Sequence, residues 1–146
     1  MKVSKLEDYL FNLYRTGVRF SVLLLGAPGI GKSYTVYSLA KKIAKYLNRE
    51  FVPYDDDIAP ILLKNPNRYF TLVDFRLTEC EPSDLLGIPR DIDNAVIYKQ
   101  LLWARTLKEV PAILFLDELT NLQRLDMTSA SYKVIFDRKA GFTTFN

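Results

Sequence analysis

Histidine is absent from this chain of 146 residues, and cysteine occurs once, at Cys80. A single cysteine forms no internal disulfide, so nothing indicates an oxidising compartment. A structural zinc site needs about four cysteine or histidine ligands, and such a site is therefore excluded. Acid–base or triad chemistry that depends on histidine is excluded for the same reason.

Long apolar runs are also lacking. Runs such as Val22 to Leu25 are far shorter than the ~20 residues that a membrane-spanning helix needs. The N-terminal residues carry Glu7 and Asp8, which interrupt any signal-peptide core. We therefore expect a cytoplasmic protein with no membrane partner.

Charge of one sign does not dominate, since 20 basic residues face 17 acidic ones and the net charge is +3. No long basic run concentrates this excess, which argues against a nucleic-acid partner. Lys41, Lys42 and Lys45 form the densest basic group, and a solvated helix face explains them most simply.

The chain does contain alternating helical and strand patterns. Helices are expected over Ser4 to Tyr14, with Ser4 as the N-cap, and over 32–47, 98–108 and 126–139. Strands are expected over Phe20 to Leu25, Tyr69 to Phe75 and Ala112 to Leu116, the first and last of them buried. The proline-rich stretch 51–67 is predicted to be an irregular loop insertion, and 81–89 a turn-rich segment. This alternation indicates one α/β domain with parallel strands.

One glycine-rich segment matches G-x-x-x-x-G-K-[ST] in full, between a predicted strand and a predicted helix. The glycines let consecutive backbone amides surround an anion, and the helix start adds the positive end of its dipole. Lys32 would contact the β- and γ-phosphates, and the Ser33 hydroxyl would ligate Mg²⁺. The predicted nucleotide-binding residues are Gly26, Ala27, Pro28, Gly29, Ile30, Gly31, Lys32, Ser33 and Tyr34.

A second motif follows the apolar run Ile113 to Leu116, which ends in Asp117 and Glu118. Ligands collect at the carboxyl ends of parallel strands, so both carboxylates should lie beside the phosphate loop. Asp117 is predicted to hold Mg²⁺, usually through a water, together with Ser33. Glu118 would polarise the attacking water, and with Lys32 it completes the predicted catalytic residues. Alone, an apolar strand that meets a polar loop is common; the pairing with the phosphate loop makes it informative.

Other nucleotide-binding classes lack their motifs here. The chain has no Asn-Lys-x-Asp segment, as a small GTPase would have, and no Leu-Ser-Gly-Gly-Gln segment, as an ABC cassette would have. No arginine-rich lid of a nucleoside kinase is evident either. ATP with Mg²⁺ is therefore the expected ligand.

With both motifs in place, the chain resembles the N-terminal α/β part of an AAA+ ATPase of the MoxR-like branch. The resemblance covers about 6–141 and rests on GAPGIGKS, EPSDLLGIP, LFLDEL and FDRKAG. It implies a P-loop NTPase fold of three α-β-α layers with a parallel sheet, and a ring of identical subunits that remodels a protein client. The segment 119–124 departs from the sequence that usually follows the acidic pair in this branch.

The resemblance also implies elements that are not found before Asn146. These are the sensor-1 strand, the arginine finger and the helical lid, so we expect a partial domain with weak hydrolysis in isolation. In the family the strand order is 5-1-4-3-2, which places one further strand between the phosphate-loop strand and the Asp117 strand. Arg124 and Arg138 fall near the family's subunit boundary, although ordinary surface arginines explain them more simply.

Two other functions remain open from the sequence. One is a nucleotide-dependent switch that binds ATP with negligible turnover. The other is a motor on nucleic acid, for which Lys41, Lys42 and Lys45 offer only a weak basic strip.

Overall fold

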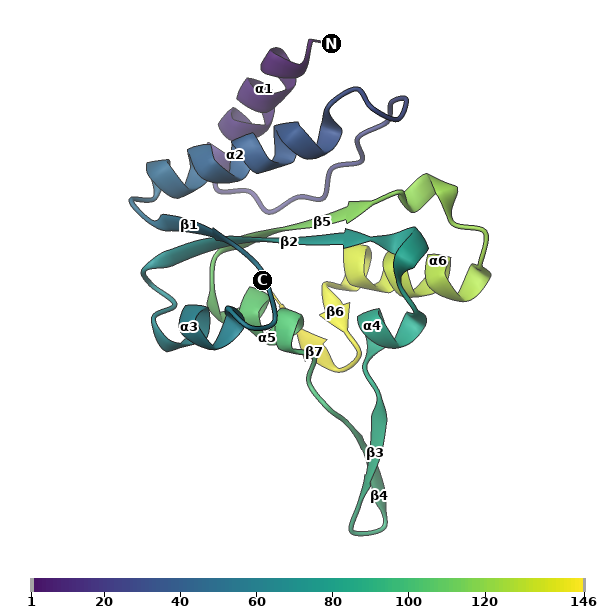
Figure 1. The fold of residues 1–146 in the computed structure, drawn as a ribbon. Helices are drawn as coiled ribbons and strands as arrows, with labels where there is room; N and C mark the ends of the chain where they lie inside the picture. The colour runs from purple at the N-terminus through teal and green to yellow at the C-terminus, as the bar shows by residue number, and fades with distance from the viewer. Residues whose placement is uncertain (1, 146) are drawn as a thin grey trace.

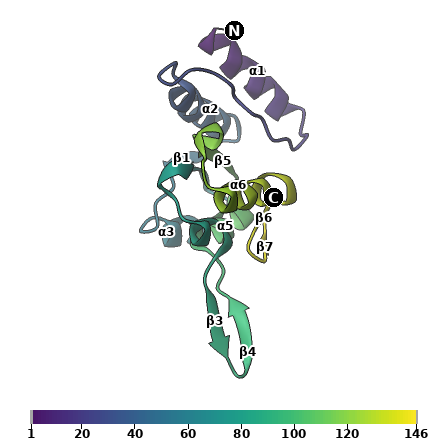
Figure 2. The ribbon, with the colours of Figure 1, turned by 90° about the vertical axis from the view of Figure 1, so that its right-hand side faces the viewer.

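The computed structural model describes residues 2–145, in which helices cover both faces of a small parallel sheet. The sheet has the order β1-β2-β5, built from Glu50–Pro53, Tyr69–Arg76 and Ala112–Asp117, and both pairings are parallel. Helices α1 (Val3–Arg15) and α2 (Lys32–Tyr46) lie on one face. The other helices are α3 (Ala59–Lys64), α4 (Pro82–Leu86), α5 (Leu102–Glu109) and α6 (Leu125–Tyr132), and α3, α5 and α6 lie on the opposite face (Figures 1 and 2). This is a mixed α/β architecture, as the alternating pattern predicted.

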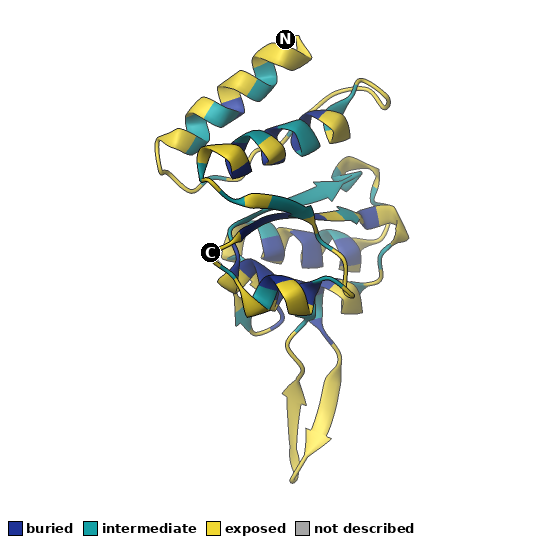
Figure 3. Cartoon of the chain, turned by 60° about the vertical axis from the view of Figure 1, so that its left-hand side comes forward, coloured by how far each residue is buried: buried dark blue, intermediate teal, exposed yellow. Residues whose placement is uncertain are grey.

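The sheet divides the core into two clusters because successive side chains of a strand point to opposite faces. Phe70 and Leu72 of β2 pack with α1 and α2, whereas Val73 packs with α5 and α6. In β5, Ile113 and Phe115 face α2, while Leu114 and Leu116 face α5. Figure 3 shows the buried residues concentrated along these two interfaces. β5 itself is only half-buried, although the sequence predicted a fully buried strand.

The predicted strand at Phe20 to Leu25 is wrong, since this segment has no regular secondary structure and pairs with no strand among residues 2–145. Only Leu24 packs into the core on the α2 side, and Leu23 and Leu25 are 60% and 74% exposed. A strand forms only when its amides and carbonyls meet those of a neighbour. β5 is hydrogen-bonded to β2 alone, so no described strand lies beside this apolar segment.

The stretch 51–67 is ordered rather than irregular, which corrects a second prediction. It holds most of β1 and all of α3. Pro53 ends an edge strand, and Pro60 lies in the first turn of α3, where a missing amide hydrogen costs nothing. Prolines therefore mark the boundaries of these elements instead of preventing them.

A β-hairpin projects from the body of the molecule, where a helix was expected to begin at Tyr98 (Figure 1). It consists of β3 (Pro89–Ile92) and β4 (Ala95–Tyr98), and every residue of both strands is exposed. Asp93 and Asn94 both have positive φ, as a two-residue hairpin turn requires. The helix therefore begins only at Leu102.

Three smaller boundaries also differ from the predictions. The N-cap of α1 is Lys2 rather than Ser4, and the segment 81–89 contains the short helix α4. The last predicted helix is α-helical only as far as Tyr132 and continues as a π-helix over Lys133–Asp137. Two short strands, β6 (Lys139–Ala140) and β7 (Thr143–Thr144), form an antiparallel pair after it.

Two packing details bear on earlier predictions. Lys42 donates a hydrogen bond to Asp8 at 2.6 Å and lies 3.7 Å from Glu7, so this lysine ties α2 to α1 and is not a free cation. None of the helices among residues 2–145 is long and apolar enough to cross a membrane.

Candidate functional site

The glycine-rich loop leads directly into α2. Gly31 is the N-cap with φ of 90°, a left-handed conformation that favours glycine, and no side chain caps the helix. The first-turn amides of a helix have no acceptors within it, and α2 has no acidic residue in that turn. The helix dipole adds to their partial positive charge. The loop therefore ends in a group of backbone donors suited to an anion.

Lys32 folds back across this loop. Its Nζ donates a hydrogen bond to the carbonyl oxygen of Gly26 at 2.7 Å. That carbonyl lies at the start of the loop and Lys32 at its end, so the ammonium group closes the loop on itself. The charge needed for a phosphate group is thus already beside the backbone amides.

The loop and the end of β5 meet through Ser33 and Asp117. The Ser33 Oγ donates to the Asp117 Oδ2 at 3.4 Å, although the two residues are 84 positions apart. A serine hydroxyl and a carboxylate supply the oxygen ligands that Mg²⁺ takes, so this pair would hold the ion directly from Ser33 and directly or through a water from Asp117. The predicted meeting of the two motifs at one sheet edge is therefore present in the structure.

Glu118 is held by two further contacts. Its backbone is left-handed with φ of 61°, and its amide donates to the Asp117 Oδ1 at 2.9 Å. Its Oε2 accepts a hydrogen bond from the Thr78 hydroxyl. Thr78 follows β2 at the sheet edge where β5 also ends, and it is not among the site residues predicted from the sequence. A polar residue just after a neighbouring parallel strand was the signal that could have identified it.

Acidic residues dominate the electrostatics at this edge. Burial raises the pKa of the Asp74 carboxyl above its usual value, and the nearby Asp117 carboxylate raises it further. Arg76 partly counters this, because its charge lowers the pKa of Asp74. The Arg76 guanidinium itself bonds Glu79 at 3.0 Å, which raises its own pKa. The site therefore combines a basic loop with a carboxylate-rich strand end.

A cavity of about 440 Å³ lies along the outer side of α2, next to the loop. Two of the residues predicted to bind the nucleotide, Ser33 and Tyr34, line this cavity, whereas Asp117 and Glu118 do not. Its lining residues are Ser33, Tyr34, Tyr37, Ser38 and Lys41. Of the other predicted loop residues, Ala27, Pro28, Gly29 and Ile30 are exposed to solvent.

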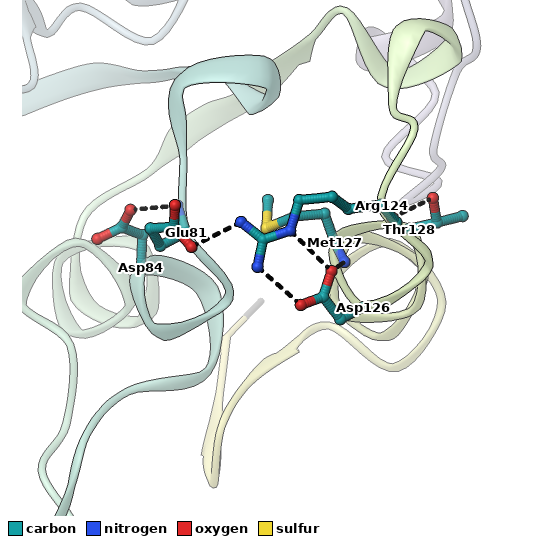
Figure 4. Close-up of polar contacts among 6 residues, drawn as sticks. All are labelled: Glu81, Asp84, Arg124, Asp126, Met127 and Thr128. Carbon is teal, nitrogen blue, oxygen red and sulfur yellow. Dashed lines mark hydrogen bonds and ion pairs between the residues drawn. The ribbon is translucent and has the colours of Figure 1, made fainter.

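Arg124 binds within its own chain, as the dashed lines of Figure 4 show. Its guanidinium donates to Glu81 at 2.8 Å and, through two nitrogens, to Asp126 at 3.2 and 2.9 Å. Glu81 is the N-cap of α4 and exchanges capping hydrogen bonds with Asp84. Arg124 thus links α4 to the start of α6, after the loop that begins at Glu118.

Comparisons with known proteins add no relative. No protein-family model matches this chain, and the searches of curated proteins and of solved structures found no match. The function of this chain is therefore inferred from the geometry of the described residues and from the motifs in the sequence.

Proposed function

We propose that this chain binds ATP with Mg²⁺ at the Gly26–Ser33 loop and hydrolyses it. The observation that carries the proposal is the 3.4 Å contact between the Ser33 hydroxyl and Asp117, which joins the two motifs. The contact brings a hydroxyl of the glycine-rich loop beside the carboxylate that follows β5, which is what a shared metal ion would require. Ser33 and Asp117 would hold the Mg²⁺, which would neutralise charge on the phosphate oxygens.

The loop would bind the triphosphate through its backbone amides and the first turn of α2. The Lys32 ammonium would exchange the Gly26 carbonyl oxygen, now 2.7 Å away, for phosphate oxygens. This exchange replaces a neutral acceptor with a charged one, which makes a stronger hydrogen bond. Lys32 therefore stabilises the bound triphosphate and the negative charge that shifts during transfer.

Glu118 is the proposed residue that orients and polarises the attacking water. Its carboxylate lies one residue beyond Asp117 and is bonded by Thr78. An oxygen that already accepts this bond is a weaker acceptor for water. Hydrolysis thus requires the Thr78 contact to open or to leave the second carboxylate oxygen available.

The proposed fold is the P-loop NTPase fold of the MoxR-like AAA+ branch. In this proposal the protein works as a ring of subunits that remodels a protein client. The three-strand parallel sheet covered by helices is compatible with the proposed fold. The lack of pairing between Phe20–Leu25 and β5 is also compatible with this fold, because in the family one further strand lies between these two segments. A neighbouring subunit would supply the arginine finger, worth ~10³–10⁵ in rate in related systems.

The contact between Thr78 and Glu118 favours a second candidate function, a switch that binds ATP without turnover. In the described conformation one oxygen of the Glu118 carboxylate, Oε2, accepts the Thr78 hydroxyl. If the Thr78–Glu118 hydrogen bond persisted with ATP bound, phosphate release would be negligible. ATP would then act only by changing the affinity of the protein for a partner.

Titration of the purified chain with a fluorescent ATP analogue and Mg²⁺, together with a phosphate-release assay, tests both functions. We expect Lys32→Ala to abolish binding, and Glu118→Gln to retain binding while phosphate release stops. Binding without release in the parent protein and in its assembled form would support the switch. Unchanged binding in Lys32→Ala would overturn the nucleotide site itself.

A further inference from the structure

A second cavity, of about 260 Å³, lies on the face of the sheet opposite α2. It lies at the carboxyl ends of β1 and β2, where the chain leaves the sheet. The residues that define its chemistry are three aromatic side chains, Tyr54, Phe75 and Trp103, and two carboxylates, Asp56 and Asp84. The cavity is separate from the Gly26–Ser33 loop and does not depend on the proposed ATPase function.

The aromatic walls of this cavity are held rigidly. Phe75 and Trp103 pack edge to face with their ring centroids 5.1 Å apart. The Trp103 indole is buried, and its Nε1 donates to the backbone oxygen of Asp84 at 2.9 Å. Tyr54 is half-buried and donates its hydroxyl hydrogen to the Asp56 Oδ1 at 2.7 Å. Trp103 also packs on Phe145, with ring centroids 5.8 Å apart, so the half-buried rings of Tyr54 and Phe75 are the ones more open to a ligand. Rings fixed in this way need no ordering before they bind a cation.

The two carboxylates of the cavity are Asp56 and Asp84. Across residues 2–145 no lysine or arginine forms an ion pair with Asp56 or Asp84. Asp84 accepts the Glu81 amide through one oxygen, at 2.8 Å. The negative charge of these carboxylates acts on Tyr54. Burial raises the pKa of the Tyr54 hydroxyl most, and Asp56 and then Asp55 raise it further. Although the net charge of the chain is +3, this aromatic cavity has two carboxylates that form no ion pair among residues 2–145.

We propose that this cavity binds an arginine side chain presented by a protein partner. A planar guanidinium stacks on aromatic rings and also donates to carboxylates, which matches both kinds of wall. Aromatic rings offer no oxygen ligand to a hydrated divalent metal, whereas they do offer a surface to a guanidinium. Asp56 and Asp84 each accept one hydrogen bond but form no ion pair among residues 2–145, and this charge complementarity with an arginine selects the occupant.

Trp103 is the sole tryptophan and reports directly on the cavity. The experiment titrates the protein with an acetylated, amidated Gly-Arg-Gly tripeptide while tryptophan fluorescence is recorded. The matched probes are the same peptide with citrulline, which is neutral and nearly isosteric, and with lysine. We expect a saturable change with the arginine peptide, a Kd of roughly 1 mM as suits one side chain, and weakening at high salt.

Three variants decide the assignment. Asp56→Asn and Asp84→Asn should each weaken binding about tenfold or more, since each removes one charged acceptor. Asp57→Asn carries the same charge change on an exposed neighbour outside the cavity lining and should leave binding unchanged. Asparagine at position 84 keeps an acceptor for the Glu81 amide, and circular dichroism checks that all three variants are folded.

Several results would overturn the proposal. Equal binding of the citrulline peptide would remove the role of charge, and equal binding of the lysine peptide would remove the role of the planar group. A response to MgCl₂ alone that Asp56→Asn abolishes would make the cavity a metal site. Loss of binding in Asp57→Asn, or no saturable response to the arginine peptide, would also contradict it.

Discussion

Thr78 donates a hydrogen bond from its hydroxyl to the Oε2 of Glu118, across a sequence separation of 40 residues. Both residues follow the carboxyl ends of adjacent parallel strands, β2 and β5. The contact places a restraint on the carboxylate that the proposed hydrolysis needs. It therefore offers a direct way to separate turnover from binding.

Substituting Thr78 with valine should raise the ATP hydrolysis rate while leaving nucleotide affinity unchanged. Valine keeps the shape of threonine but removes the donor, so the Glu118 carboxylate becomes free to bind water. A hydrogen bond to a charged group contributes about 1.5–3 kcal/mol, which corresponds to a rise of roughly tenfold or more. Thr78→Ser, which retains the hydroxyl, should behave as the parent does in the same phosphate-release assay. A rate that falls with valine would instead show that Thr78 assists catalysis.

Ser33→Ala should remove the dependence of nucleotide affinity on Mg²⁺. The Ser33 hydroxyl is the proposed direct ligand of the ion, and Asp117 beside it holds the ion usually through a water, so loss of the hydroxyl weakens Mg²⁺ binding. Affinity for ATP measured with Mg²⁺ and with EDTA should then differ little. Ser33→Thr retains the hydroxyl and should restore the difference. If alanine preserves the full Mg²⁺ effect, Ser33 is not a ligand.

Arg124→Gln should lower the melting temperature slightly at neutral pH, because Arg124 joins Glu81 to Asp126 at the protein surface. Arg124 also holds the pKa of Asp126 below its usual value, chiefly through their hydrogen bonds. An acid with a lowered pKa stabilises the folded state above its unfolded pKa and loses that effect as the pH falls through the folded value. The melting difference should therefore shrink below about pH 4. Arg105→Gln, which breaks a single surface pair, is the control. A difference that persists at low pH would assign the effect to packing.

Asp74→Asn should stabilise the protein at neutral pH. Burial first, and the Asp117 carboxylate second, raise the pKa of Asp74, so its ionised form is disfavoured in the folded state. An acid with a raised pKa destabilises the fold at neutral pH, and this penalty disappears as the pH falls through the folded pKa. The gain in melting temperature over the parent should thus vanish at acidic pH. Thermal unfolding from pH 4 to 8 measures this, and a pH-independent gain would contradict the electrostatic cause.

Local sequence patterns predicted much of the fold because they depend on neighbours along the chain. The apolar periodicity of 32–47 predicted α2 to within one residue of its observed end, and the runs after Tyr69 and Ala112 predicted β2 and β5. The same patterns misplaced the start of α5, since β4 is an apolar run, Ala95–Tyr98, that the structure leaves exposed in a hairpin instead of burying in a helix. The prolines of 51–67 predict a loop but mark the ends of β1 and α3.

The phosphate-loop motif, the acidic pair after β5 and the alternation of helices and strands follow from the order of residues alone. Three other features depend on how the chain packs: Phe20–Leu25 has no strand partner among residues 2–145, Thr78 contacts Glu118, and Tyr54, Asp56 and Trp103 share a cavity. All three have one cause. Periodicity records whether a residue is buried, but hydrogen-bond partners and cavity walls come from segments that only the packing of the chain brings together.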